Sequence, residues 1–120
     1  MPGRVLIVED EMLVSMLLED MLEELGYQPV GPAARLDRAL EKASDAAIEA
    51  AILDVNLNGQ TSFSVANVLR RRGIPFIFVT GYDASVSSEH FQNTPVLQKP
   101  FQRHELARAL DAIMRPQHAG

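Results

Sequence analysis

Cysteine is absent from the chain, and so is any long hydrophobic segment. Without cysteine there is no disulfide framework and no thiolate metal site, which fits a reducing compartment. No apolar run approaches the roughly 20 residues that span a bilayer. The first five residues run directly into a strand-like segment, without the basic and then apolar stretches of a signal peptide. We therefore expect a soluble cytoplasmic protein with no membrane contact.

An excess of positive charge is also lacking, since the net charge is −5. A nucleic-acid-binding surface requires a basic face. The one basic cluster, Arg70–Arg72, falls in the last turn of a predicted helix, where cations suit the helix dipole. A glycine-rich phosphate loop and a Gly-x-Ser-x-Gly turn are missing too, which argues against nucleotide binding and serine hydrolase chemistry. Direct nucleic-acid binding is therefore not expected.

The length and composition are those of one globular domain. The chain has 120 residues, of which 47% are hydrophobic and 22% charged, and this is enough for a single core. We find no internal repeat and no linker. We predict one domain over residues 1–120.

Short apolar runs alternate with segments of helical periodicity. The runs predict strands over 5–8, 50–54, 74–80 and 94–98, with a weaker strand over 28–34 that two prolines confine to a sheet edge. The periodic segments predict helices over 12–25, 37–46, 62–72 and 103–114, and a poor serine-rich helix over 84–91 that we expect to be the most mobile part of the fold. Helical connections of this length indicate a parallel, doubly wound α/β sheet.

Local signals suggest how several helices begin and end. Asp37 and Ser62 are predicted N-caps. Leu17 is assigned to the apolar stripe of the first helix, and Gly26 is placed just after its end. Pro116 should end the last helix, leaving frayed residues beyond it.

Polar side chains follow the predicted strands where each strand ends. Glu9 and Asp10 follow the first strand, Asp54 ends the third, and Thr80 and Lys99 end the fourth and fifth. Taken alone, Asp54 is better interpreted as a residue that starts a turn or caps the next helix. The carboxyl ends of parallel strands, however, share one edge of the sheet. Clustered carboxylates repel, and a divalent cation such as Mg²⁺ would relieve that repulsion. A nearby lysine and hydroxyl are what the remaining oxygens of a phosphoryl group need.

This arrangement resembles the receiver domain of two-component response regulators over essentially the whole chain. The resemblance implies the flavodoxin-like strand order 2-1-3-4-5. It implies that Asp54 is the phosphorylated aspartate and that Thr80 and Lys99 contact the phosphoryl group. It also implies a Mg²⁺ site formed by Glu9, Asp10, Asp54 and the backbone carbonyl of Asn56, and a cis Lys99–Pro100 bond.

Two features depart from the usual receiver pattern. Val96 stands where the family has an aromatic switch residue, so the resemblance does not imply the usual coupling of hydroxyl and aromatic rotation. The segment Phe78–Tyr82 resembles the Phe-x-Thr-Gly-Tyr motif of an atypical receiver subgroup. Tyr82 either takes over part of the aromatic role or packs on the loop with its hydroxyl in water.

The resemblance implies a signalling domain that is not a turnover enzyme. Its donor would be a sensor histidine kinase or a phosphotransfer protein, and its output would be altered binding of an unidentified downstream protein, with homodimerisation left open. The alternative is a pseudo-receiver, an interaction module without phosphorylation. A third class is a Mg²⁺-dependent phosphohydrolase with an aspartyl nucleophile. It usually needs a second aspartate two residues after the first as general acid, and Asn56 in that place cannot do the proton transfer.

Overall fold

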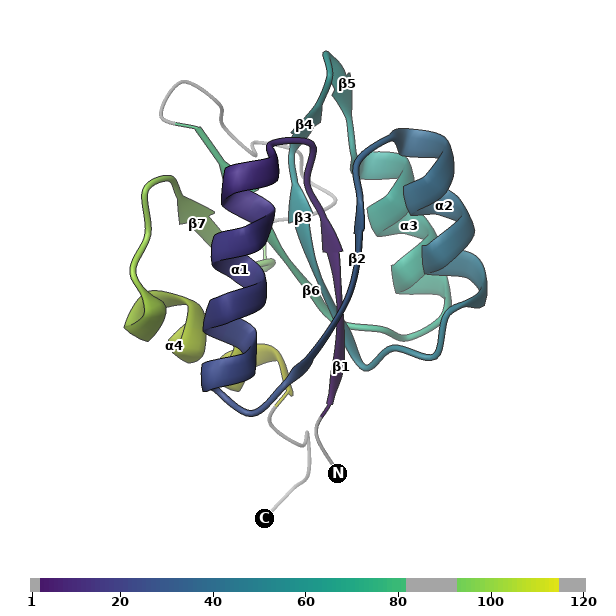
Figure 1. Cartoon of the computed structure of the whole chain (residues 1–120). Coiled ribbons are helices and arrows are strands. Elements are labelled where there is room, and N and C mark those ends of the chain that lie inside the picture. Colours follow the sequence, from purple (N-terminus) through teal and green to yellow (C-terminus); the bar gives the residue numbers. More distant parts are fainter. Residues whose placement is uncertain (1–2, 82–92, 115–120) are drawn as a thin grey trace.

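A five-stranded parallel sheet forms the centre of the computed structural model, which describes residues 3–81 and 93–114 (Figure 1). The sheet order is β2-β1-β3-β6-β7. Helices α1 and α4 cover one face of the sheet, and α2 and α3 cover the other. The sheet strands are β1 (Arg4–Val8), β2 (Gln28–Ala33), β3 (Ala50–Asp54), β6 (Phe76–Thr80) and β7 (Val96–Gln98). The helices are α1 (Met12–Glu24), α2 (Leu36–Asp45), α3 (Phe63–Arg71) and α4 (Arg103–Met114).

The three central strands are buried on both faces, and their residues divide between two cores by alternation. Leu6 and Phe78 belong to the core under α2 and α3, whereas Ile7 and Ile77 belong to the core under α1 and α4. Successive side chains of a strand point to opposite faces of the sheet, so an unbroken apolar run fills both cores at once. This is why β1, β3 and β6 lack the alternating polar pattern of one-sided strands.

The predicted doubly wound fold and strand order are confirmed. Order 2-1-3-4-5 becomes β2-β1-β3-β6-β7 only because two short strands, β4 (Asn56–Leu57) and β5 (Gln60–Thr61), form a separate antiparallel hairpin. We did not predict this hairpin from the sequence. Its turn places Asn58 at φ 51° and Gly59 at φ 85°, which suits the turn-forming tendency of Asn and Gly.

Of three local predictions, those for Asp37 and Leu17 were wrong, and that for Ser62 is confirmed in position only. Helix α2 begins one residue before Asp37, so Arg35 occupies the N-cap position and Asp37 lies in the first turn. Ser62 does occupy the N-cap position of α3, but its hydroxyl makes no capping hydrogen bond. Leu17 is 48% exposed instead of contributing to the buried stripe of α1, where Leu22 is buried instead.

Some predictions fall outside the described residues. These are the helix over 84–91, the role of Tyr82 and the end of the last helix at Pro116. Within the described residues, every helix is too short or too polar to cross a bilayer.

Candidate functional site

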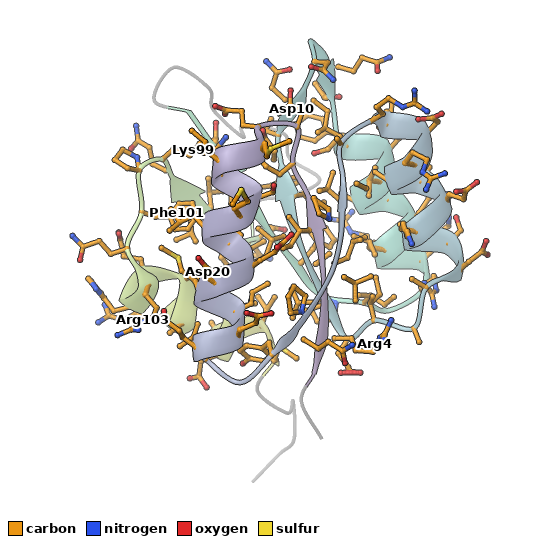
Figure 2. The ribbon with its side chains drawn as sticks, viewed as in Figure 1. Arg4, Asp10, Asp20, Lys99, Phe101 and Arg103 are labelled. Atoms are coloured by element: carbon orange, nitrogen blue, oxygen red, sulfur yellow. The ribbon has the colours of Figure 1, made fainter. Side chains whose placement is uncertain are left out.

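The carboxyl edge of the sheet brings together polar groups that are far apart in sequence. Strand β1 leads directly into Glu9, strand β3 ends at Asp54, and Lys99 follows β7. Figure 2 shows Asp10 and Lys99 at the same end of the molecule, near the start of α1. The chain therefore gathers carboxylates and an ammonium group at one rim, as parallel topology requires.

Lys99 lies at the centre of this cluster. Its Nζ is 2.9 Å from Oε1 of Glu11, 3.3 Å from Oε1 of Glu9 and 3.4 Å from Oδ2 of Asp54. The Lys99 side chain is 19% exposed, whereas those of Glu9 and Asp54 are 1% and 7% exposed. One largely buried positive charge thus faces three carboxylates, of which two are buried and one is exposed.

Asp54 is held at the end of a central strand and faces an open cleft. Its Oδ1 accepts a hydrogen bond from the backbone N–H of Asn56 at 3.2 Å. Register with β6 places it beside Val79, and the backbone N–H of Val55 donates to the Val79 carbonyl. The cleft has a volume of about 330 Å³, and Asp10, Glu11 and Lys99 also line it. A small anion can reach the Asp54 carboxylate from this side.

Of the other predicted site residues, Asp10 and Asn56 line this cleft, whereas Thr80 does not. Asp10 lines it, and its Oδ2 accepts a hydrogen bond from the backbone N–H of Asn58 at 3.1 Å. Asn56 also lines it, but its side-chain oxygen accepts from Gly59 N–H in the hairpin. Thr80 is buried at the end of β6, and its hydroxyl donates to the Gly81 carbonyl at 3.2 Å. The backbone N–H of Lys99 donates to the Thr80 carbonyl at 2.8 Å.

Glu11 is a member of the site that we did not predict from the sequence. It is the third acid of the run Glu9–Glu11, and its contact with Lys99 joins residues 88 positions apart. The run itself was the only signal, because nothing in the sequence indicates which way the Glu11 side chain turns. The predicted cis Lys99–Pro100 bond is confirmed, and Val96 is 42% exposed on β7.

Burial and like charge perturb the acids of the cluster. Burial raises the pKa of Glu9 from 4.5 to about 7, and the neighbouring Asp54 charge adds to this shift. Burial also raises the pKa of Asp54, although interactions with Glu9 and Lys99 oppose the rise. Burial alone would lower the pKa of Lys99, but the Glu11 hydrogen bond and the charges of Asp54 and Glu9 raise it above its usual value. The cluster therefore holds more negative charge than one lysine balances.

A divalent cation fits this excess charge. One carboxylate oxygen each from Glu9, Glu11 and Asp54 lie within 4.8 Å of one another. Oε1 of Glu9 is buried and, apart from its ion pair with Lys99 at 3.3 Å, accepts no hydrogen bond within the described residues. Carboxylate oxygens beside an open cleft are suitable ligands for Mg²⁺, which retains waters and binds phosphate oxygens.

Replacing Glu9 should stabilise the metal-free protein in alkaline solution. A carboxyl whose pKa is higher in the folded state than in the unfolded state contributes stability below the unfolded pKa, and this contribution is lost as pH rises through the folded pKa. Glu9→Gln should therefore match the wild type near pH 4.5 and exceed it by about 1–3 kcal/mol near pH ~8. Urea denaturation in the presence of a chelator measures the difference.

The matched control is Glu23→Gln, which removes the same charge from an exposed position on α1. It should follow the wild type at both pH values. Equal stability of Glu9→Gln and wild type near pH ~8 would contradict the raised pKa assigned to Glu9. Added Mg²⁺ should stabilise the wild type more than Glu9→Gln, because the variant has lost one metal-binding oxygen.

The fold and site define a class of protein: a doubly wound α/β domain with a buried aspartate at the carboxyl edge, flanked by acids and a lysine. Comparison with known families gives the particular family, since the response regulator receiver domain model matches residues 5–111. The chain belongs to the response regulator receiver family.

Curated relatives agree with this assignment. Over 106 residues, covering 85% of this chain, the sequence is 33% identical to the phyllosphere-induced regulator PhyR of Methylorubrum extorquens. It is 32% identical over 114 residues, 92% of this chain, to the transcriptional regulatory protein PdtaR of Mycobacterium tuberculosis. These matches cover only 40% of PhyR and 56% of PdtaR. Both relatives therefore contain substantial sequence beyond the matched region.

Solved structures show the same similarity in three dimensions. The solution structure of SdrG from Sphingomonas melonis is 46% identical, with a TM-score of 0.85 over 94% of this chain and 97% of SdrG. The receiver domain of PhyR from Erythrobacter litoralis is 28% identical, with a TM-score of 0.84 over 99% of this chain and 95% of that domain. Similarity to SdrG and PhyR is consistent with the atypical subgroup that the Phe78–Tyr82 motif suggests.

Proposed function

We propose that this domain accepts a phosphoryl group on Asp54 and uses it as a signalling switch. The Asp54 carboxylate supports this proposal. It is buried at a strand end, lines a cleft and lies 3.4 Å from the Lys99 ammonium. A carboxylate oxygen can attack phosphorus there, while the ammonium offsets charge on the transferred group. The similar protein SdrG has also been solved in a BeF3-activated conformation, which supports the same chemistry in a relative.

The donor would be the phosphohistidine of a sensor histidine kinase or of a phosphotransfer protein. An Asp54 oxygen forms the new P–O bond, the P–N bond of phosphohistidine breaks, and its electron pair stays on the imidazole, which takes up a proton. Later hydrolysis returns the Asp54 carboxylate and inorganic phosphate. The domain is thus modified and reset without being a turnover enzyme.

The other site residues would bind and orient the reacting groups. Glu11 is paired most closely with Lys99, at 2.9 Å, so Glu9, Asp10, Asp54 and the Asn56 carbonyl would hold Mg²⁺, which supplies charge neutralisation on the phosphoryl oxygens. Lys99 would donate to a phosphoryl oxygen, and the Thr80 hydroxyl would turn from the Gly81 carbonyl toward the same group. The modified surface would then bind a downstream protein. The domain would act in the cytoplasm, where a kinase that uses a nucleoside triphosphate can phosphorylate it.

The test is incubation with acetyl phosphate and Mg²⁺, followed by intact-protein mass spectrometry. We expect one added phosphoryl group, and no adduct when a chelator replaces Mg²⁺. Absence of the adduct under both conditions would favour the pseudo-receiver, which binds partners without phosphorylation. Repeated phosphate release in excess of the protein, from a stable phosphate ester, would instead indicate a hydrolase.

A further inference from the structure

Glu11 makes the shortest contact of the Lys99 ammonium group. Oε1 of Glu11 lies 2.9 Å from Nζ, compared with 3.4 Å for the Asp54 oxygen. In the described part of the chain, Lys99 is the one side chain that binds the Glu11 carboxylate. Figure 2 shows Lys99 at the end of the molecule where α1 begins, as it does Asp10. The lysine that faces the acceptor is thus held most closely by a different acid.

Local helix capping does not explain this position of the Glu11 side chain. Glu11 occupies the N-cap of α1 with extended backbone, φ −90° and ψ 115°, but its side chain makes no capping hydrogen bond. A carboxylate there would be stabilised by the N-terminal N–H groups of the helix. The Glu11 carboxylate instead faces Lys99, so this ion pair takes precedence over the cap.

The three acids around Lys99 differ in how easily they can leave it. Glu11 is 63% exposed, whereas the Glu9 and Asp54 side chains are 1% and 7% exposed. Glu9 is also held by the backbone N–H of Glu11 at 3.1 Å, and Asp54 by Asn56 N–H. A carboxylate that already contacts water loses little free energy when it leaves an ion pair, because water replaces the partner. Glu11 is therefore the partner that Lys99 can exchange.

An ammonium group has three hydrogen-bond donors, and three carboxylates surround Lys99 in this structure. A phosphoryl group on Asp54 needs at least one of these donors. We propose that Glu11 is a positioning residue, a resting-state counter-ion that competes with the phosphoryl group for Lys99. This inference rests on the proposed phosphoryl acceptance at Asp54. Release of Glu11 then accompanies modification, and the strength of the pair sets how readily the site accepts a phosphoryl group.

Two variants separate the contact from the charge. Glu11→Gln removes the charge and weakens the contact, and Glu11→Asp keeps the charge on a side chain too short to hold Lys99 in the same way. Glu23→Gln is the matched control, because it removes the same charge from an exposed site on the same helix. With Mg²⁺ present, both Glu11 variants should bind beryllium trifluoride, a phosphoryl mimic, about two- to fivefold more tightly than wild type. An NMR titration measures the affinity.

A second measurement, NMR of the Lys99 side chain, reports the Glu11–Lys99 contact in the absence of any phosphoryl group or mimic. In the metal-free protein, the Lys99 Cε resonances should shift in both Glu11 variants and remain in place in Glu23→Gln. Unchanged beryllium trifluoride affinity in the Glu11 variants would overturn the inference. So would weaker binding of Mg²⁺ alone by Glu11→Asp, because that outcome makes Glu11 a metal ligand. If the wild type binds no beryllium trifluoride with Mg²⁺, the proposed function itself fails.

Discussion

Asp54→Asn should eliminate the phosphoryl adduct while leaving the domain folded. An amide is a far weaker nucleophile than a carboxylate. The substitution nearly preserves side-chain shape, and the single amide oxygen can still accept from one of the two donors that now contact Asp54, Asn56 N–H or the Lys99 ammonium. Removing one buried negative charge also relieves repulsion with Glu9, so the metal-free variant should unfold at a slightly higher temperature than wild type. Intact-protein mass after exposure to acetyl phosphate and Mg²⁺ measures acceptance, and thermal denaturation in a chelator measures stability.

Asp45→Asn is the matched control for this substitution. Asp45 is exposed at the end of α2, so the variant should form the adduct at the wild-type rate. An adduct of equal yield on Asp54→Asn would show that another carboxylate accepts the phosphoryl group. Asp10, which lines the same cleft, would then be the first to replace.

Phe78→Ala should cause the largest loss of stability among the changes considered. Phe78 is fully buried on the central strand β6. Its ring packs edge-to-face on Phe63 and Phe76, with centroid separations of 5.7 Å and 5.5 Å. Truncating a buried phenylalanine removes its contacts and leaves a cavity, which typically costs about 3–5 kcal/mol. That is a large share of the about 5–15 kcal/mol available to a domain.

Urea denaturation measures this cost as a shift of the midpoint with an unchanged slope. Met12→Ala is a suitable control, because Met12 is 75% exposed on α1 and its truncation should change stability by less than about 0.5 kcal/mol. A loss below about 1 kcal/mol in Phe78→Ala would mean that the core under α2 and α3 collapses around the vacancy.

Much of the fold followed from patterns that depend only on near neighbours in sequence. The apolar runs at 5–8 and 50–54 are too short for helices and lack polar alternation, so they predict strands buried on both faces of a sheet. Pro29 and Pro32 limited the second strand to an edge, where β2 lies. Parallel topology then placed Glu9, Asp54 and Lys99 at one edge, because all parallel strands end on the same side.

Details that depend on competition between local partners were not predictable in this way. Ser62 is a good capping residue, yet its buried hydroxyl has no hydrogen-bond partner among the residues that the structure describes. The β4–β5 hairpin depends on how two short segments pair across a turn of Asn58 and Gly59, and two residues per strand leave almost no periodic signal.

The class of fold and the set of groups at the carboxyl edge follow from local sequence patterns, because strand polarity and helical connections leave little freedom in where a strand ends. The acids that Lys99 contacts follow from the folded arrangement, since burial and the charges of residues dozens of positions away set side-chain direction at the sheet edge. Glu11 shows this most clearly: its exposed carboxylate pairs with Lys99, while Asp10 next to it accepts a hydrogen bond from Asn58.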